Sequence, residues 1–478
     1  MNFYNFFTDE QKKNIHEASL TILEETGMLV KNKDALDIFK KNGCRVDGQM
    51  VKFPRRLVGE KMASVPPTFT FKAQNPEFDV VLPDGRPVIV TGSSAPNVVD
   101  PISGEERRGS SRDVANIAYL INELPGFDVF SISILADDAP PDMRSLYRFY
   151  PALKNCKKPV RSNTPTIPDL EKVLQMGHAI AGSEAAYMDR PFINHHYCPV
   201  ISPLTYDVES TEAVIYLTKK ALPVYGTIVP NAGMTSPMSL LSTLTLGNAE
   251  FLSLCFLMQS VRAGCEVIYA VLSTVADMRA GDYAPGAIET GILQMGHSEM
   301  ARFYNVPSGG YIGLTNSQLN DVQNGYETAM NTTAALLGGA DLFNMGGLLG
   351  GLMAFDFAKA VIDNEIAMNL KHLCKGIPYQ EKDFCLDLIQ KLGPAGNYMD
   401  QAHTAKNMRK VTHYPSIGVR GFRSKWEHDG KPCAAGQAAA LARKILLQPN
   451  KNAFSAEIDQ KVRAHIPNLP DGNAGWYE

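Results

Sequence analysis

The stretch VPSGGYIGLTNSQLNDVQNGYE, residues 306–327, contains the unit that decides the fold. Residues 306–312 have the short, partly β-branched pattern of a buried strand, and a run with helical spacing begins at Asp321. Residues 313–327 carry five amides, two acids and a serine, with no Lys, His or Cys. The sequence predicts a strand, a polar loop and a helix in this order.

The same order recurs along the chain. β-branched or aromatic runs predict eight strands, at 88–91, 127–135, 159–163, 192–198, 224–229, 266–272, 306–312 and 341–345. Helical patterns alternate with them, at 111–123, 169–181, 211–221, 239–261, 287–303, 321–337 and 356–374. Eight parallel βα units predict an α/β fold of the TIM (β/α)8 barrel type. A doubly wound open sheet is the alternative, and the lack of a GxGxxG motif after the first strand counts against it.

The regions before and after this alternation have different patterns. Residues 1–85 predict an N-terminal cap of helices and hairpins, whose first helix starts at a capping box of Thr8 and Gln11 and ends at Gly27. A second helix is expected at 34–41, and hairpins are expected at 69–100. Residues 86–375 form the predicted barrel, and 376–478 form a helical extension packed on it.

Composition excludes several classes of protein. The 478 residues carry a net charge of −4 with a sequence pI near 6.2, which gives no basic footprint for nucleic acid or acidic membrane. The apolar segment 239–258 contains Asn248 and Glu250, so we expect no membrane span there. Eight scattered cysteines and the lack of a signal-peptide pattern indicate a cytoplasmic protein with reduced thiols. A homo-oligomer is expected.

In such a barrel the site lies at the carboxyl ends of the strands. Aromatic, amide, Arg and His residues occupy these positions. P-loop, HExxH, GxSxG, HxH and paired-cysteine motifs are all missing, so we expect no catalytic zinc and no nucleotide cofactor. His195 and His196 are adjacent in a strand and face opposite ways, so at most one lines the barrel. The loop MGGLLGGLM at 345–353 has either of two roles, tight packing or a flat surface for a large planar group.

The chain resembles the trimethylamine methyltransferase family. The matching segments, in the family's order, are SPL at 202–204, PNAGMTSPMSL at 230–240, LGNAEFL at 246–252, DMRAGDYAPGAIE at 277–289, GYIGLTNSQLNDVQNGYE at 310–327 and DNE at 363–365. The resemblance implies a TIM barrel that moves a methyl group from an amine to the Co(I) of a corrinoid on a separate corrinoid-binding protein. Founding members carry pyrrolysine at a place equivalent to 314–323, where this chain has only standard residues.

This departure changes the substrate that the resemblance implies. Family members without pyrrolysine are associated with betaines, and a quaternary ammonium needs no activation because its nitrogen leaves as a neutral amine. The expected substrate is therefore a quaternary amine of the glycine betaine, proline betaine or carnitine type. The competing interpretations are a barrel lyase or hydrolase acting on a small acid, and a betaine-binding protein without catalysis.

The expected roles of individual residues follow from that substrate. Aromatic faces would hold the ammonium, and the candidates are Tyr225, Tyr269, Tyr311 and Phe343. His195 or His196, Arg279, Asn316 and Gln318 would bind the carboxylate, with Arg161 as a further possibility. Catalysis by positioning is assigned to Gln318, Asp321 or Glu289, although Asp321 also fits an ordinary helix cap. The residues expected to face the corrinoid are Gly346, Gly347, Gly350 and Gly351.

Overall fold

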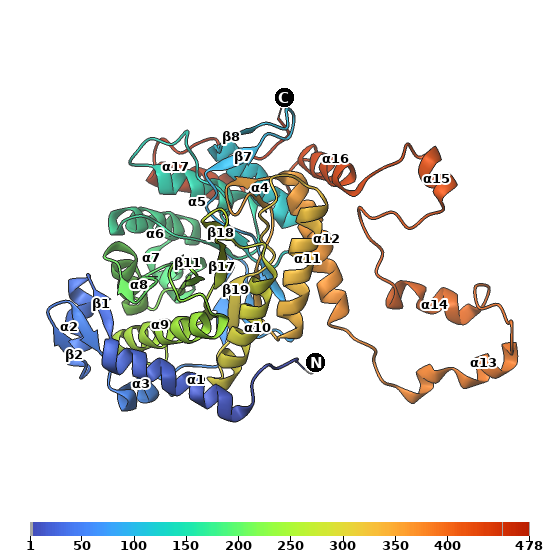
Figure 1. Cartoon of the computed structure of the whole chain (residues 1–478). Helices are drawn as coiled ribbons and strands as arrows, with labels where there is room; N and C mark the ends of the chain where they lie inside the picture. Colours follow the sequence, from blue (N-terminus) through green and yellow to red (C-terminus); the bar gives the residue numbers. More distant parts are fainter. Residues whose placement is uncertain (1–2, 452, 478) are drawn as a thin grey trace.

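The computed structural model describes residues 3–451 and 453–477, and two parallel β-sheets form its centre (Figure 1). Each of the eight predicted runs contains a strand. One sheet has the order β14-β11-β10-β9 and consists of β9 (Phe130–Ser131), β10 (Val160–Ser162), β11 (Ile193–Tyr197) and β14 (Val224–Gly226). The other has the order β16-β19-β20-β6 and consists of β6 (Val88–Val90), β16 (Tyr269–Ala270), β19 (Ser308–Tyr311) and β20 (Leu342–Asn344).

Single bridges connect the edges of the two sheets. Val90 pairs in parallel with Val129, and Ile228 pairs in parallel with Val271. All pairings within the two sheets are also parallel. The predicted α/β fold is therefore confirmed, whereas closure of the sheets into one barrel stays a prediction.

Helices follow the parallel strands and surround them (Figure 1). They are α4 (Ser111–Glu123), α5 (Arg144–Asn155), α6 (Ile167–Ala181), α8 (Glu209–Lys219), α9 (Leu240–Val261), α10 (Ile288–Phe303), α11 (Val322–Leu337) and α12 (Phe357–Leu373). Seven of them match the predicted helices to within two residues at each end, and α5 falls outside the predicted set. Pro151 lies inside α5, which weakens the helical pattern, but most of the helix is buried. Burial therefore overrides the local preference here.

Side chains of each parallel strand alternate between two faces. Residues such as Val88, Val90, Tyr225 and Leu342 form a small buried cluster together with the hairpin of β4 (Phe69–Phe71) and β5 (Val80–Leu82). We call this cluster the inner core and its side of the sheets the inner face. Neighbouring residues such as Phe343 belong to the large cluster shared with the helices, on the outer face. Thr70 of the hairpin bonds Glu266, which precedes β16, so the hairpin covers the amino ends of the strands.

The N-terminal region forms the predicted helices. Helix α1 (Asp9–Thr21) begins with the capping box of Thr8 and Gln11, and a π-turn (Ile22–Thr26) leads to Gly27 at φ +82°. Helix α2 (Lys33–Lys41) and α3 (Arg55–Met62) follow, and α3 packs against α9. A five-stranded sheet lies beside them, in the order β12 (Val200–Ile201), β13 (Thr205–Tyr206), β1 (Met28–Val30), β3 (Met50–Lys52) and β2 (Arg45–Asp47).

Shorter elements complete the body of the protein. Two small sheets follow the carboxyl ends of the parallel strands, one of β15 (Asn231–Ala232), β17 (Thr274–Asp277) and β18 (Asp282–Ala284), the other of β21 (Leu348–Leu349), β22 (Ala354–Phe355), β7 (Asn97–Val99) and β8 (Glu106–Arg108). A 3-10 turn (Pro76–Phe78) and α7 (Glu184–Asp189) are the remaining pieces of this part of the chain.

Helix α9 is the one described helix that is long and apolar enough to cross a membrane. Of the window that qualifies, 78% is buried inside the protein, which is typical of a core helix. Asn248 and Glu250, which interrupt the apolar run of the sequence, are satisfied by tertiary contacts. Asn248 donates to Tyr304 (2.9 Å) and Ser19 (2.8 Å), and Glu250 accepts from Ser202 (2.7 Å).

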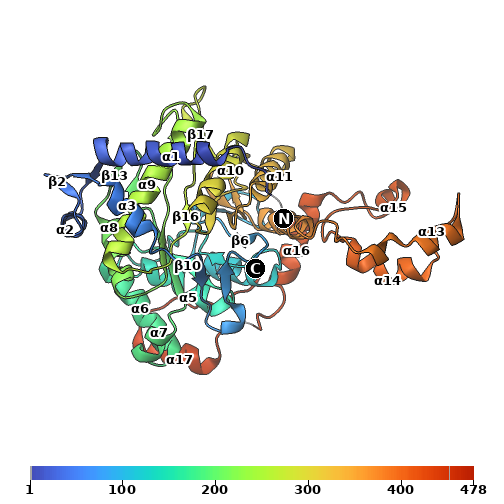
Figure 2. The same cartoon turned by 90° about the horizontal axis from the view of Figure 1, so that it is seen from below.

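The C-terminal extension is helical, but only part of it packs on the body. Helix α16 (Ala434–Leu446) packs against α12 and α4, and α17 (Ala456–His465) packs against α6. The segment before α16 carries a 3-10 turn (Glu381–Phe384), α13 (Leu386–Leu392), α14 (Ala402–Val411) and α15 (Arg423–His428). Figures 1 and 2 both show these three helices standing away from the body.

Candidate functional site

A group of polar side chains lies on the inner face toward the carboxyl ends of the strands. We call Arg161, His196, Cys198, Tyr311 and Asn344 the inner polar cluster. They come from β10, β11 and the residue after it, β19 and β20. The inner core closes the amino side of this cluster. A ligand that contacts the cluster must therefore arrive from the carboxyl ends.

Arg161 is the central cation of the cluster. Its side chain is 1% exposed, and one nitrogen, Nη2, donates to Asn344 Oδ1. The guanidinium carbon lies 5.5 Å from the centre of the Tyr225 ring. Nε and Nη1 are buried and have no hydrogen-bond acceptor among the described residues. Burial lowers the pKa of Arg161 to about 10, so the group stays positively charged at neutral pH without a carboxylate partner.

The two adjacent histidines face opposite sides, as predicted, and the structure assigns each one. His196 is on the inner face, where its ring stacks on Tyr225 at 6.1 Å between centres. His195 is on the outer face against Phe149 of α5, so the structure places it away from the inner polar cluster. Burial, followed by the charges of Arg161 and Arg148, holds the pKa of His196 well below its usual range. His196 is therefore neutral at physiological pH.

Tyr311 and Cys198 form the accessible edge of the cluster. Tyr311 is half-buried, bonds Ser93 and lies close to both Arg161 and Cys198. The Cys198 thiol is exposed and bonded to Thr227 Oγ1 at 2.9 Å, yet burial raises its pKa. The exposed thiol therefore lies on the side of the cluster that solvent reaches. The raised pKa also keeps the thiol protonated, so it is no ready nucleophile.

Two of the predicted aromatic residues, Tyr269 and Phe343, face away from the inner polar cluster. Tyr269 donates to Asn248 (3.0 Å) and packs against Phe251 at 4.3 Å between ring centres, both on α9. Phe343 is fully buried in the outer cluster, whereas its neighbours Leu342 and Asn344 face inward. The structure therefore does not bring these two rings together with Tyr225 and Tyr311. The sequence places an aromatic residue at a strand end, but the register of the sheet decides its face.

Arg279 and Glu289 lie on a different rim. The Arg279 side chain is 90% exposed and pairs with Asp277 at 2.5 Å. Glu289 is in the first turn of α10, and both residues line a cavity of about 520 Å³ with Met238 and Met278. Neither belongs to the inner polar cluster. Arg279, predicted to bind the substrate carboxylate from a strand end, lies instead in the turn between β17 and β18.

Most side chains of the polar loop between β19 and α11 form hydrogen bonds within the loop or to neighbouring segments. Asn316 donates to Tyr283 O and accepts from Gly286 N, both at 2.9 Å. Asp321 caps α11 through the Asn324 N–H at 3.0 Å, as expected for an N-cap residue. Glu327 accepts from Thr315 Oγ1 (2.6 Å) and Asn316 N (2.9 Å). Asn316 and Asp321 thus hold the loop in place through these hydrogen bonds, and Gln318 and Asp321 are both exposed.

The glycines after β20 divide into two pairs. A Cβ at Gly346 would lie 2.4 Å from the Phe127 ring, and one at Gly347 would lie 2.1 Å from the Phe355 ring. These two glycines, predicted to face the corrinoid, are buried and allow tight packing. Gly350 and Gly351 are half-buried and hydrogen-bond the polar loop through Ser317 O (2.8 Å) and Thr315 O (2.9 Å). The two loops therefore form one connected rim.

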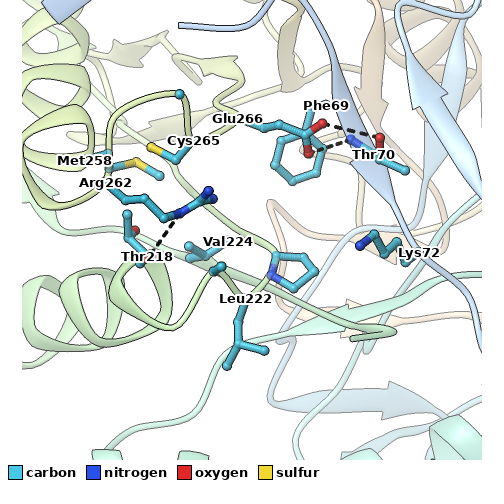
Figure 3. A pocket seen from close by; sticks show the side chains of 13 residues that line it. Phe69, Thr70, Lys72, Thr218, Leu222, Val224, Met258, Arg262, Cys265 and Glu266 are labelled. Atoms are coloured by element: carbon cyan, nitrogen blue, oxygen red, sulfur yellow. Dashed lines mark hydrogen bonds between the residues drawn. The ribbon is translucent and has the colours of Figure 1, made fainter. Parts of the chain in front are cut away.

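Two cavities lie at opposite ends of the parallel strands. One of about 650 Å³ adjoins the carboxyl ends of β9 and β10 and is lined by Ser94, Asn163, Arg148, Arg144 and Arg108 among others. Arg148 donates to Ser94 (3.1 Å) and Ser162 (2.9 Å), so this cavity adds positive charge beside the cluster. The other, of about 290 Å³, lies at the amino ends beneath the β4–β5 hairpin (Figure 3). Its Glu266 bonds Thr70 and its Arg262 bonds Thr218, so these charges hold the hairpin and a helix end.

Strand-end reasoning missed Cys198 and Tyr283 and gave Arg161 a minor role. Tyr283 lies in β18, and its pKa is raised by burial and by the neighbouring Tyr311 phenol. A residue on an added hairpin cannot be found by following strand ends. Arg161 had a detectable signal, because an arginine inside a strand run is uncommon unless its charge has a task.

The cluster is suited to binding rather than acid–base chemistry. It presents a permanent cation, a neutral imidazole, a protonated thiol, an amide and aromatic rings. No group of three or more His, Cys, Asp and Glu able to hold a metal occurs within residues 3–451 and 453–477. The arrangement fits a ligand with an anionic group directed at Arg161 and an apolar or cationic group directed at the rings.

The family model and the most similar curated proteins point to the same family. The model of the family described as trimethylamine methyltransferase (MTTB) matches residues 1–469. Glycine betaine methyltransferase of Desulfitobacterium hafniense (strain Y51) is 32% identical over 97% of this chain and 96% of its own length. Trimethylamine methyltransferase MttB of D. hafniense (strain DSM 10664 / DCB-2) is 30% identical over 97% and 94%, respectively.

Solved structures agree at the level of the fold. The Methanosarcina barkeri monomethylamine methyltransferase (MtmB) has a TM-score of 0.50 and 12% identity, covering 94% of this chain and 92% of its own. A hydroxylamine complex of MtmB gives a TM-score of 0.51 over 95% and 92% of the two chains. At this identity the likeness concerns the fold alone.

Proposed function

The chain belongs to the trimethylamine methyltransferase family and is a methyltransferase, and from this premise we propose that its methyl donor is a quaternary amine bearing a carboxylate. Glycine betaine, proline betaine and carnitine are of this type. The proposed acceptor is the Co(I) of a corrinoid held by a separate corrinoid-binding protein. The proposed product is the corresponding tertiary amine.

The proposal includes a closed TIM barrel. Four parallel strands in each sheet, and the bridges Val90–Val129 and Ile228–Val271 at both pairs of edges, support an eight-stranded ring. In such a ring the inner polar cluster lies at the carboxyl end, where barrel enzymes bind their substrates.

One observation carries the choice of substrate: the unpaired, buried guanidinium of Arg161. A buried charge without a partner is costly, and a carboxylate supplies both the counter-charge and hydrogen-bond acceptors for an arginine. Nε and Nη1 are the two nitrogens that lack an acceptor among the described residues. Trimethylamine has no anionic group to offer them, and its protonated form would be repelled.

The aromatic rings supply the second half of the recognition. A quaternary ammonium has no N–H, so ring faces are its natural partners, each contact contributing about 0.5–2 kcal/mol. Tyr311 is half-buried at the accessible edge, whereas Tyr225 lies beneath Arg161 and His196. A zwitterion held by its carboxylate at Arg161 therefore directs its ammonium toward Tyr311 and the opening.

This orientation is the main task of the protein in the proposed reaction. The bond between nitrogen and one methyl carbon breaks, its electron pair leaves with the neutral tertiary amine, and the reduced cobalt supplies the pair for the new bond to carbon. No proton moves, so neutral His196 and protonated Cys198 are compatible with the chemistry. Holding the methyl carbon in line with its acceptor can lower the barrier by several kcal/mol.

The rim of the site is the proposed contact with the corrinoid. Gly350 and Gly351 lie beside Gln318 and Asn316 of the polar loop. Because glycine has no side chain, this part of the rim carries no projecting groups, which suits the approach of a large planar group. Gly346 and Gly347 support this rim from below through their packing on Phe127 and Phe355.

The test incubates the purified chain with a Co(I) corrinoid protein and follows formation of methyl-cobalt by absorbance. Glycine betaine, proline betaine and carnitine are compared with tetramethylammonium and trimethylamine. We expect turnover with at least one carboxylate-bearing donor and little or none with the other two. Reaction of trimethylamine or tetramethylammonium in preference to every betaine would contradict the proposed substrate class.

A further inference from the structure

The segment between α12 and α16 carries helices that bury nothing. We call residues 377–412, which include α13 and α14, the arm. All residues of α13 and α14 are described, and none of them is buried. Figures 1 and 2 show the arm projecting from the side of the body near α12. Helices of this length are marginal in water without tertiary packing, so the arm needs a surface to cover it.

The arm is apolar as well as exposed. Among its large hydrophobic residues Ile377 is 98% exposed, Met399 88%, Tyr379 78% and Val411 69%. Single exposed apolar residues are normal on a protein, but a row of them on one projecting segment marks an interaction surface. Residues 413–417 return to the body, where Glu365 of α12 accepts from Ser416 N at 2.7 Å and His413 Nε2 lies 2.9 Å away. The arm is therefore held outward at both ends.

A second uncovered apolar face lies on the body. Val322, Tyr326, Met330 and Leu337 of α11 are 83%, 52%, 54% and 42% exposed. Their spacing puts them on one side of the helix. We call these four residues the α11 stripe. Glu327 is the only charged residue of α11, and it is bonded to the polar loop, so the stripe is uninterrupted by charge.

We propose that two copies of this chain exchange their arms, so that the arm of each copy covers the α11 stripe of the other. One chain carries both uncovered surfaces, and a symmetric exchange covers both at once. A different protein docking on the arm would leave the stripe bare. Helix α14 carries Lys406, Arg409 and Lys410 and no acid, whereas the chain as a whole has a net charge of −4. Long-range attraction therefore also favours docking of α14 on another copy of this chain.

The first test measures the oligomeric state of the full-length protein by sedimentation equilibrium. We expect a dimer at micromolar concentration. Met330→Glu in the stripe and Val411→Glu in the arm should each weaken the dimer at least tenfold, because each would place a charge in an apolar contact. Ile102→Glu is the matched control, since Ile102 is 59% exposed on a remote turn. Circular dichroism verifies that each variant is folded.

The second test asks which surfaces meet. Chains with Val411→Glu are mixed with chains carrying Met330→Lys. Each variant alone has two damaged contacts, whereas the mixed dimer has one unaltered contact and one with opposite charges. We expect mixed dimers to predominate. The proposal would be overturned if the protein is a monomer at all concentrations, or if none of these substitutions weakens the dimer. It would also be overturned if the arm variants lose binding to a corrinoid protein but still dimerise.

Discussion

Arg161 shows how one residue can define a site. Its guanidinium is buried and charged, with two nitrogens that find no acceptor in the described part of the chain. Arg279, which the sequence favoured, is exposed and already paired with Asp277. In the sequence, both arginines stand near the predicted end of a strand. Only the tertiary structure distinguishes them, because it buries Arg161 without a carboxylate partner and leaves Arg279 exposed in a turn.

Replacement of Arg161 gives the most direct prediction. Arg161→Ala should lower kcat/KM for a betaine by roughly 10²–10³, because the carboxylate loses its charged partner. Arg161→Lys should recover part of this loss, since it restores the charge without the paired donors. Tetramethylammonium, if it reacts at all, should be insensitive to both changes. Steady-state kinetics of methyl-cobalt formation measures these effects.

Two further variants test this assignment. Arg56→Ala, on an exposed helix far from the cluster, should leave the kinetics unchanged. If Arg279→Ala greatly lowers kcat/KM and Arg161→Ala does not, the substrate carboxylate binds at the rim near Arg279 and not at Arg161.

The pH dependence of activity follows from the same cluster. The pKa of His196 is well below 6.5 and that of Arg161 is about 10. Tyr311 and Cys198, which face Arg161, have raised pKa values and stay neutral through the neutral range. We expect kcat/KM for a betaine to be flat from about pH 6 to 9 and to fall above pH 10, as Arg161 loses its proton. An inflection near pH 6.5 would show that a histidine titrates in the reaction.

At the scale of elements, the polar loop after β19 turns out to be a structural joint. Its amides and acids bind one another, α11 and the loop after β20, through Glu327, Asp321, Ser317 and Thr315. The sequence predicted the strand, the loop and the helix correctly. It could not show that the Asn316 side chain donates a hydrogen bond to Tyr283 O, because Tyr283 lies in β18, 33 residues earlier in the chain.

A buried ion pair in α12 supports the neighbouring loop. Lys359 and Asp363 are both fully buried and paired, and Asp363 accepts from Gly347 N at 2.8 Å. Asp363→Asn should destabilise the protein by about 3–5 kcal/mol, because it leaves Lys359 buried without its counter-charge. The double variant Lys359→Met, Asp363→Leu should be less destabilised than Asp363→Asn. Urea unfolding measures both, and equal losses would contradict the ion-pair explanation.

On the scale of the whole molecule, buried histidines connect the fold to pH. His297 is fully buried between Ser273 Oγ (2.8 Å) and Tyr269 Oη (3.3 Å), and burial lowers its pKa to about 3. His195 has a pKa of about 3 for the same reason. The unfolded chain takes up these protons near pH 6.5, whereas the folded protein does not. Stability should therefore fall as the pH drops from about 6.5 toward 3.

A single substitution isolates this effect. Each such histidine contributes a slope of up to about 1.4 kcal/mol per pH unit in this window. His297→Gln should be less stable at pH 7 through lost packing, but its unfolding free energy should fall less steeply between pH 6 and 4. Glu250, whose pKa burial raises to about 7, is present in both proteins and cancels in the comparison. Parallel curves for the two proteins would contradict the prediction.

The sequence by itself determined the strands, most of the helices and the family. These features depend on local periodicity, capping residues and ordered motifs, which any stretch of chain carries with it. Only the tertiary structure decided that Arg161 and His196 face inward while His195, Tyr269 and Phe343 face outward. It also decided that α13 and α14 stand uncovered. The face of a strand depends on its register with its neighbours, and the burial of a helix depends on what else reaches it. Both are set by contacts between residues far apart in the chain.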